Sequence, residues 1–170
     1  MTSKRMQLLL VLIGAGVLFL VYRYRQPRFI AGETAPDFTV TLLNNERARL
    51  YDLRGKYVLL QFWGSWCGPC RAENPYLVEL YKKYMTRGFE IFSIGIEQSP
   101  TSWQRAILAD GMGWEYHTAE YEDFDGPVAK MYNIRAIPAT FLINPQGVIM
   151  GVNQSPETID KMLETGLNGR

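Results

Sequence analysis

The stretch YVLLQFWGSWCGPC, from Tyr57 to Cys70, decides the fold of this chain. Residues 57–63 form a continuous run of strand-forming residues, a pattern typical of a strand that is buried on both faces. Apolar residues then recur at helical spacing from Cys67 to about Arg87, and Gly88 ends the pattern. A buried strand that leads directly into a helix is the first half of a crossover unit.

The alternation of strand and helix continues on both sides of this stretch. Ser99-Pro100 offers an N-cap followed by proline at the first helical position, which predicts a second crossover helix that ends near Gly111. The other expected elements are strands at 38–43, 48–50, 89–97, 114–119, 139–144 and 148–152, and helices at 127–132 and after Ser155-Pro156. Such an order predicts an α/β domain in which helices flank a mixed central sheet, with an N-terminal β-hairpin.

The N-terminal segment is apolar enough to enter a bilayer. No charge appears between Arg5 and Arg23, and the run LLLVLIGAGVLFLVY is close to the length that a membrane-spanning helix needs. Bulky and basic residues follow it in place of a small-x-small cleavage site, so we expect an uncleaved anchor. We therefore divide the chain into an anchor at residues 1–25, a tether at 26–35 and one domain at 36–170, with residues 6–22 in contact with lipid.

Composition excludes several classes of function. The formal net charge is +1, from 18 basic and 17 acidic residues, so the chain has no excess of basic residues for binding nucleic acid. Its two cysteines are a redox couple, half of a metal site or a small local loop. A zinc site needs two further ligands, and the single histidine, His117, is expected at the surface or at a strand end.

The C-x-x-C of Cys67 and Cys70 lies where a buried strand meets a helix, which is the setting of a redox motif. A helix N-terminus carries partial positive charge and free N–H groups that favour a thiolate. We therefore expect Cys67 to be the attacking thiol. Cys70, one turn further on, is expected to resolve the mixed disulfide.

These residues carry a family resemblance. The sequence FWGSWCGPC, together with Glu73 and Pro75 in the next helix and Ile137-Pro138 before ATFLIN, resembles the thioredoxin superfamily. Within it, the chain resembles the membrane-anchored TlpA/ResA-like thiol-disulfide oxidoreductases, from about Ala35 to the C-terminus. The resemblance implies a thioredoxin-like fold, to which residues 99–119 add an inserted helix and strand.

The resemblance also implies which residues form the site. The Ile137–Pro138 bond is expected to be cis and to lie against the cysteine pair. The substrate groove is expected to be lined by Trp66, Gly68, Pro69, Ile137 and Pro138. The alternatives are that Trp66 belongs to the core and that Pro138 only starts a strand.

Three polar residues near the cysteines carry separate expectations. Glu73 matches the acid that ResA-like proteins place beside the cysteines, where it would take a proton from Cys70 or raise the thiol pKa values; an acid that only favours the helix dipole is the alternative. Gln61 stands where thioredoxin has a buried acid, so that proton-transfer group is missing. Arg71 is expected to be solvated.

The resemblance favours the reduction of disulfides outside the cytoplasm. It implies an oxidised protein substrate, such as the haem-binding C-x-x-C of an apocytochrome c, and a membrane protein that donates electrons. We expect a monomer with no cofactor. The positive charges on the two sides of the anchor nearly balance, so they do not decide its orientation.

Two other functions stay open. A thiol peroxidase of the peroxiredoxin class needs a Pro and Thr constellation that is absent before Cys67. A tethered binding module would use the groove beside Pro138 and keep an unreactive, buried cysteine pair.

Overall fold

The computed structural model describes residues 3–25 and 29–169. The elements follow one another along the chain as α1 (Ser3–Arg25), β1 (Thr39–Thr41), β2 (Arg47–Arg49), β3 (Tyr57–Trp63), α2 (Gly68–Tyr84), β4 (Phe89–Ile96), α3 (Pro100–Ala109), β5 (Tyr116–Glu120), α4 (Pro127–Met131), β6 (Ala139–Ile143), β7 (Ile149–Val152) and α5 (Pro156–Asn168). Every strand and helix predicted for the domain is present, with ends that differ by up to three residues.

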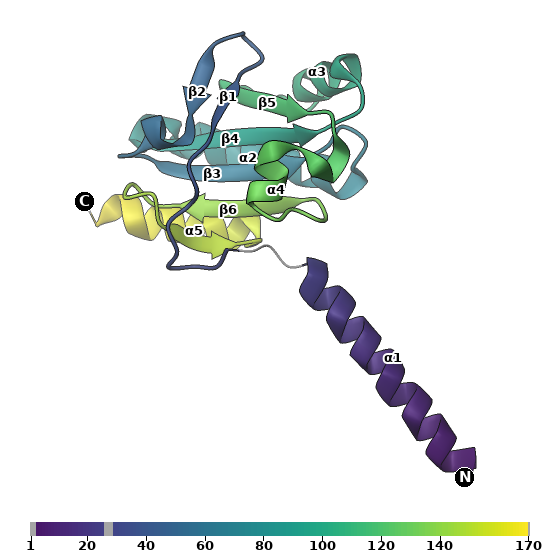
Figure 1. Ribbon diagram of the computed structural model, residues 1–170. Helices are drawn as coiled ribbons and strands as arrows, with labels where there is room; N and C mark the ends of the chain where they lie inside the picture. Colours follow the sequence, from purple (N-terminus) through teal and green to yellow (C-terminus); the bar gives the residue numbers. More distant parts are fainter. Residues whose placement is uncertain (1–2, 26–28, 170) are drawn as a thin grey trace.

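One mixed sheet organises the domain (Figure 1). Its strand order is β5-β4-β3-β6-β7, in which β3, β4 and β5 are parallel while β6 and β7 run antiparallel to their neighbours. The predicted hairpin of β1 and β2 forms a separate antiparallel pair. The predicted thioredoxin-like architecture is therefore confirmed, and the start of α2 lies at the carboxyl edge of the parallel strands.

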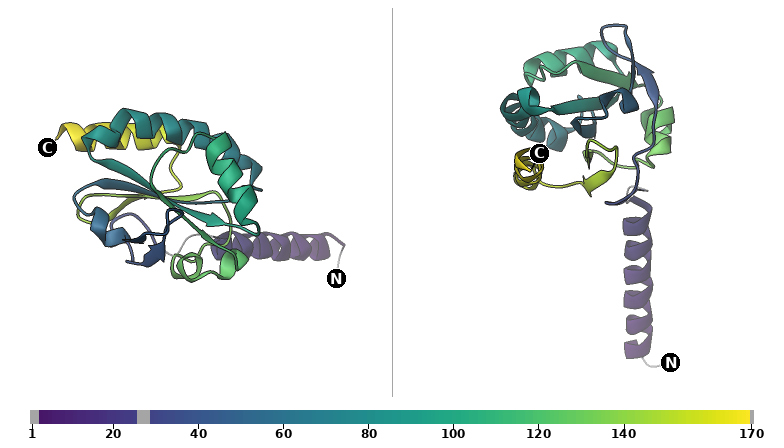
Figure 2. Two further views of the ribbon diagram at one scale, coloured as in Figure 1. Left: turned by 90° about the horizontal axis from the view of Figure 1, so that it is seen from above. Right: turned by 90° about the vertical axis from the view of Figure 1, so that its left-hand side faces the viewer.

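Alternation along β3 divides the core into two layers. Val58, Leu60 and Phe62 pack with α4 and the hairpin, whereas Leu59 and Trp63 pack with α2, α3 and α5. Figure 2 shows α4 and the hairpin on one face of the sheet and α2, α3 and α5 on the other. Each fully buried large side chain contributes roughly 1.5–3 kcal/mol, so β3 is fixed from both sides.

The last residues of the predicted tether pair with the edge of the sheet, at the start of β7. The Gly32 N–H donates to the Ile149 carbonyl at 2.8 Å, and the Ile149 N–H donates to the Glu33 carbonyl at 2.9 Å. Thr34 forms an isolated antiparallel bridge with Val148. Residues 26–28 lie outside the described part of the chain.

The helix α1 stands apart from the domain in Figure 1. Its span from Lys4 to Tyr22 is long and apolar enough to cross a membrane, and none of it is buried against the protein.

Candidate active site

Cys67 is the N-cap of α2 and ends the short loop that leaves β3. Its backbone is extended, its N–H donates to the Gly64 carbonyl at 3.0 Å, and its carbonyl accepts from the Arg71 N–H at 3.0 Å. Pro69 in the first turn has the fixed φ that suits a helix start. The sequence therefore places the sulfur of Cys67 at the positive end of α2.

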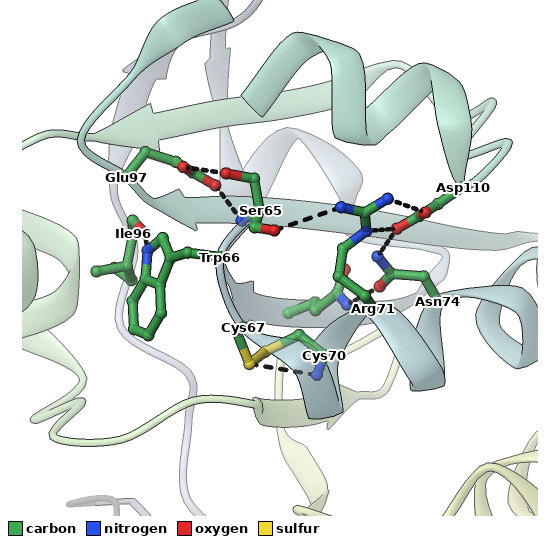
Figure 3. Close-up of a disulfide and its surroundings, with 10 residues drawn as sticks. Ser65, Trp66, Cys67, Cys70, Arg71, Asn74, Ile96, Glu97 and Asp110 are labelled. Carbon is green, nitrogen blue, oxygen red and sulfur yellow. Dashed lines mark hydrogen bonds and ion pairs between the residues drawn. A yellow bond between two sulfur atoms is a disulfide. The ribbon is translucent and has the colours of Figure 1, made fainter. Parts of the chain in front are cut away.

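The two cysteines form a disulfide (Figure 3). The Cys70 N–H also donates to Sγ of Cys67 at 3.2 Å, which is the contact that stabilises a thiolate at this position. Cys67 keeps 5% of its surface exposed, whereas Cys70 is fully buried. Only Cys67 has a surface that a partner can reach.

The structure gives the following for the residues predicted to form the groove. Gly68 and Pro69 are exposed in the first turn of α2. The Ile137–Pro138 bond is cis, and Ile137 packs against the apolar cluster that contains both cysteines. Trp66 is 56% exposed beside them.

Trp66 is fixed by a polar contact at its edge. Its Nε1 donates to the Ile96 carbonyl at 2.8 Å. Gly64 allows this close approach, because a Cβ there would stand 2.9 Å from Trp66 Nε1 and 3.0 Å from the Ile96 oxygen. Beside Trp66 lies a hollow of about 590 Å³, which Ser65, Glu97 and Phe124 help to line. Trp66 is therefore an exposed side chain beside a hollow, and its place in a substrate groove stays a prediction.

Glu73 is half-buried in α2, three residues after Cys70. Its Oε2 is buried and makes no hydrogen bond within the described residues. Burial raises the pKa of the carboxyl group above its ordinary value of 4.5. A carboxyl group with such a pKa is able to hold a proton nearer to neutral pH.

Arg71 is only partly solvated: its side chain keeps 34% of its surface exposed, and it is also held by an ion pair that was not predicted. Its Nε and second terminal nitrogen donate to the two carboxylate oxygens of Asp110 at 2.5 and 2.6 Å. Its other terminal nitrogen donates to the Ser65 carbonyl at 3.3 Å. Asp110 is 39 residues away in the sequence, so local pattern gave no sign of this partner.

Glu97 is the residue near the site that sequence reasoning missed. It follows β4 and is 1% exposed, yet its carboxylate accepts from the Ser65 N–H at 2.5 Å and from the Ser65 hydroxyl at 2.8 Å. Burial raises the pKa of Glu97, while the Ser65 bonds and the charge of Arg71 act in the opposite direction. An acid at the end of a strand expected to be buried was the signal available in the sequence.

Gln61 takes part in a chain of buried amide and hydroxyl groups. Its Nε2 donates to Asn74 Oδ1 at 3.0 Å, and its Oε1 accepts from the Ser93 hydroxyl at 2.8 Å. Asn74 in turn donates to Asp110 at 2.7 Å. A neutral amide thus fills the place of thioredoxin's acid, and it links the sheet to the Arg71–Asp110 pair.

His117 is the second residue of β5, so the expectation of a strand end is confirmed, while the alternative of a surface position was wrong because the side chain is buried. It stacks on Trp114, and burial lowers its pKa to about 4. No group of three or more metal-ligating side chains occurs in the portion of the chain that the structure covers.

Comparison with known proteins gives the family of this chain. Residues 31–152, which are more than half of it, match the AhpC/TSA family. The chain belongs to the AhpC/TSA family. The AhpC/TSA match covers all five strands of the central sheet and the cysteine pair.

Curated relatives define the activity of this AhpC/TSA member. Thiol-disulfide oxidoreductase ResA of Geobacillus kaustophilus is 35% identical over 95% of this chain and 93% of its own length. ResA of Oceanobacillus iheyensis is 32% identical over 93% of this chain and 83% of its own length. The prediction of a TlpA/ResA-like thiol-disulfide oxidoreductase is confirmed.

Solved structures agree with this assignment. The thioredoxin domain of a thiol-disulfide oxidoreductase from Bacteroides vulgatus superimposes with a TM-score of 0.75 at 29% identity. This superposition covers 82% of this chain and 99% of the Bacteroides vulgatus domain. The C-terminal domain of a thiol-disulfide oxidoreductase from Bacteroides thetaiotaomicron has a TM-score of 0.76 at 26% identity, over 86% of this chain and 99% of that one.

Proposed function

We propose that this oxidoreductase is a membrane-tethered reductase of protein disulfides outside the cytoplasm, working through Cys67 and Cys70. The observation that carries the proposal is the unequal exposure of the two cysteines at the start of α2. Cys67 is the accessible one and receives the Cys70 N–H, while Cys70 is wholly buried behind it. Attack and resolution therefore fall to different residues.

The reaction begins with the reduced pair. The Cys67 thiolate attacks one sulfur of the substrate disulfide, the substrate S–S bond breaks, and the leaving sulfur takes up a proton. Cys70 then loses its proton and attacks the Cys67 sulfur, which releases the second substrate thiol. The substrate gains two electrons, and the protein is left with the Cys67–Cys70 disulfide.

Glu73 is proposed as the group that receives the proton of Cys70. It stands on the same helix three residues later, a spacing that places two side chains on one face. Its raised pKa suits a carboxyl group that exchanges a proton with a thiol.

The substrate backbone is proposed to dock on Ile137 and Pro138, with Trp66, Gly68 and Pro69 as the opposite wall. Exposed Gly68 and Pro69 and the half-buried Ile137 and Pro138 support this placement. The hollow beside Trp66 gives room for side chains that flank the substrate cysteine.

The proposed setting follows from α1 and from the resemblance stated above. The apolar span Lys4–Tyr22 holds the protein on the membrane, with the domain outside the cytoplasm. An electron-donating membrane protein then regenerates the dithiol, and an apocytochrome c is the proposed substrate. The domain works as a monomer.

Trapping with two cysteine variants tests the assignment of roles. Cys70→Ser keeps the attacking thiol and loses the resolving one, so it accumulates mixed disulfides with oxidised substrate. Cys67→Ser loses turnover and traps nothing. Non-reducing electrophoresis of the full chain in membranes measures both.

Other outcomes would contradict the proposal. Trapping by Cys67→Ser would reverse the two roles. A wild-type pair that no thiol reagent reduces would favour the binding module, and consumption of peroxide by the pair would favour a peroxidase.

A further inference from the structure

Ser65, two residues before Cys67, is held through every polar group that it has. Its N–H and its hydroxyl both donate to the carboxylate of Glu97, at 2.5 and 2.8 Å. Its carbonyl accepts from Arg71 at 3.3 Å. Figure 3 shows Ser65 between these two side chains.

The two side chains come from different parts of the fold. Glu97 follows β4, whereas Arg71 lies in α2 and is fixed by Asp110 just after α3. Asn74 donates to the same Asp110 oxygen that Arg71 Nε contacts. The loop before the cysteines is therefore held between the sheet and the two helices that follow it. We call the contacts of Ser65 with Glu97 and Arg71 the clamp.

We propose that Glu97 is a positioning residue for thiol-disulfide exchange, which holds Ser65 so that Cys67 stays at the start of α2 once the disulfide is reduced. The proposal rests on Cys67 being the attacking thiol, as proposed above. A carboxylate that is 1% exposed is costly to bury unless its oxygens are bonded. Both oxygens of Glu97 accept hydrogen bonds from Ser65, so the bonds that offset the cost of burying this carboxylate are made to the loop before the cysteines.

Reduction makes the clamp necessary. In the oxidised protein the disulfide itself holds Cys67 beside Cys70. After reduction that bond is gone, and the Cys67 sulfur stays near the Cys70 N–H only if the preceding loop keeps its conformation. Loss of the clamp therefore weakens stabilisation of the thiolate and raises the pKa of the Cys67 thiol.

Removing the charge of Glu97 changes the pKa of the Cys67 thiol in the direction opposite to loss of the clamp. A negative charge near a thiol raises the thiol pKa, so charge removal alone lowers it or leaves it unchanged. Glu97→Gln keeps an acceptor for Ser65 and removes the charge. Glu97→Ala removes both, so the two variants separate positioning from charge.

Glu120 provides a matched control. It ends β5, is 6% exposed, and its carboxylate accepts from the N–H groups of Val128 and Ala129 at 2.7 and 3.0 Å. Burial raises its pKa as it does that of Glu97. The bonds of its carboxylate go to the start of α4, away from the cysteine loop. Its backbone carbonyl accepts from the Glu97 N–H at 2.9 Å, a bond that does not use the side chain removed in Glu120→Ala.

The test measures the reduced full chain in detergent for the wild type and for Glu97→Ala, Glu97→Gln and Glu120→Ala. The pH dependence of Cys67 alkylation by iodoacetamide gives the thiol pKa, and reduction of an oxidised peptide gives kcat/KM. We expect Glu97→Ala to raise the thiol pKa and lower kcat/KM about tenfold, a factor equal to about 1.4 kcal/mol. Glu97→Gln should stay within about threefold of the wild type, and Glu120→Ala should leave the thiol pKa unchanged.

Each other result overturns the inference. Equal changes in thiol pKa and kcat/KM for Glu97→Ala and Glu97→Gln would show that the charge of Glu97 is the cause. No change in either variant would show that Glu97 does not position Cys67. A thiol pKa that also moves in Glu120→Ala would indicate a general loosening of the sheet. Should Glu97→Ala fail to fold, Ser65→Ala decides, since it removes one of the two bonds and should raise the thiol pKa by a smaller amount.

The wild type separates this inference from the proposed function. An active wild type with an unchanged Glu97→Ala contradicts the positioning role alone. A wild type that exchanges no disulfide contradicts the proposed function, and the positioning role with it.

Discussion

Glu73 has a buried oxygen that no described residue binds, and this makes its ionisation sensitive to the fold. Its pKa is raised in the folded protein by burial, so between about pH 4.5 and the folded pKa the native state holds a proton that the unfolded state has lost. Stability then falls as pH rises through this window.

Glu73→Gln removes this dependence. At low pH the variant and the wild type both carry a neutral side chain and should be similarly stable. Above pH 4.5 the oxidised variant should become progressively the more stable of the two. Urea unfolding at several pH values measures the difference, and a wild type that gains stability relative to Glu73→Gln as pH rises would contradict the burial of this carboxyl group.

At the residue scale, the sequence predicted what short motifs encode. Cys67 and Cys70 are recognisable within a few neighbouring residues, and the cis bond before Pro138 was implied by the family resemblance. The partners of Arg71 and Ser65 lie 39 and 32 residues away, so only the folded chain brings them together. For that reason the clamp on the cysteine loop was missed, and so was the ion pair that Arg71 forms with Asp110.

The loop between β3 and α2 depends on one glycine. At Gly64 a new Cβ would stand 3.0 Å from the Ile96 carbonyl oxygen, which is backbone and has little freedom to move. Gly64→Ala should therefore push Trp66 away from Ile96 and reduce the free energy of unfolding by roughly 1–3 kcal/mol.

Gly113→Ala is the matched control for this element. A Cβ at Gly113 would stand 3.9 Å from its nearest neighbour, the Gly111 carbonyl oxygen, which is an ordinary contact. Denaturant unfolding should show a change within about 0.5 kcal/mol for Gly113→Ala. Equal losses in the two variants would show that Gly64 is not a point of close approach.

Elements were the easiest part of the fold to predict. The buried strands β3 and β4 read as runs rich in apolar, strand-forming residues, and proline after serine marked the starts of α3 and α5. The sheet edge was harder, because residues 32–35 pair with residues 147–149 through backbone groups that no side-chain pattern reveals.

At the scale of the whole molecule, α1 is the part that the domain leaves uncovered. We expect the full chain to float with phosphatidylcholine vesicles in a density gradient. Lysines in place of Leu12 and Leu18 should release it, because each costs roughly 2.5–3.5 kcal/mol at the centre of a spanning helix.

Leu108→Lys is the control for membrane association. Leu108 is 81% exposed on α3, so a lysine there changes the surface of the domain and leaves α1 intact. The control protein should float as the wild type does. Flotation of the Leu12→Lys, Leu18→Lys double variant, or release of the control, would contradict the anchor.

The equilibrium reduction potential of Cys67–Cys70 tests the central claim most directly. The full chain in detergent is equilibrated with thiol-disulfide buffers, and free thiols are trapped and counted. A reductase fed by an electron donor should have a potential well below about −200 mV. A potential near −120 mV, typical of an oxidant, would contradict the account.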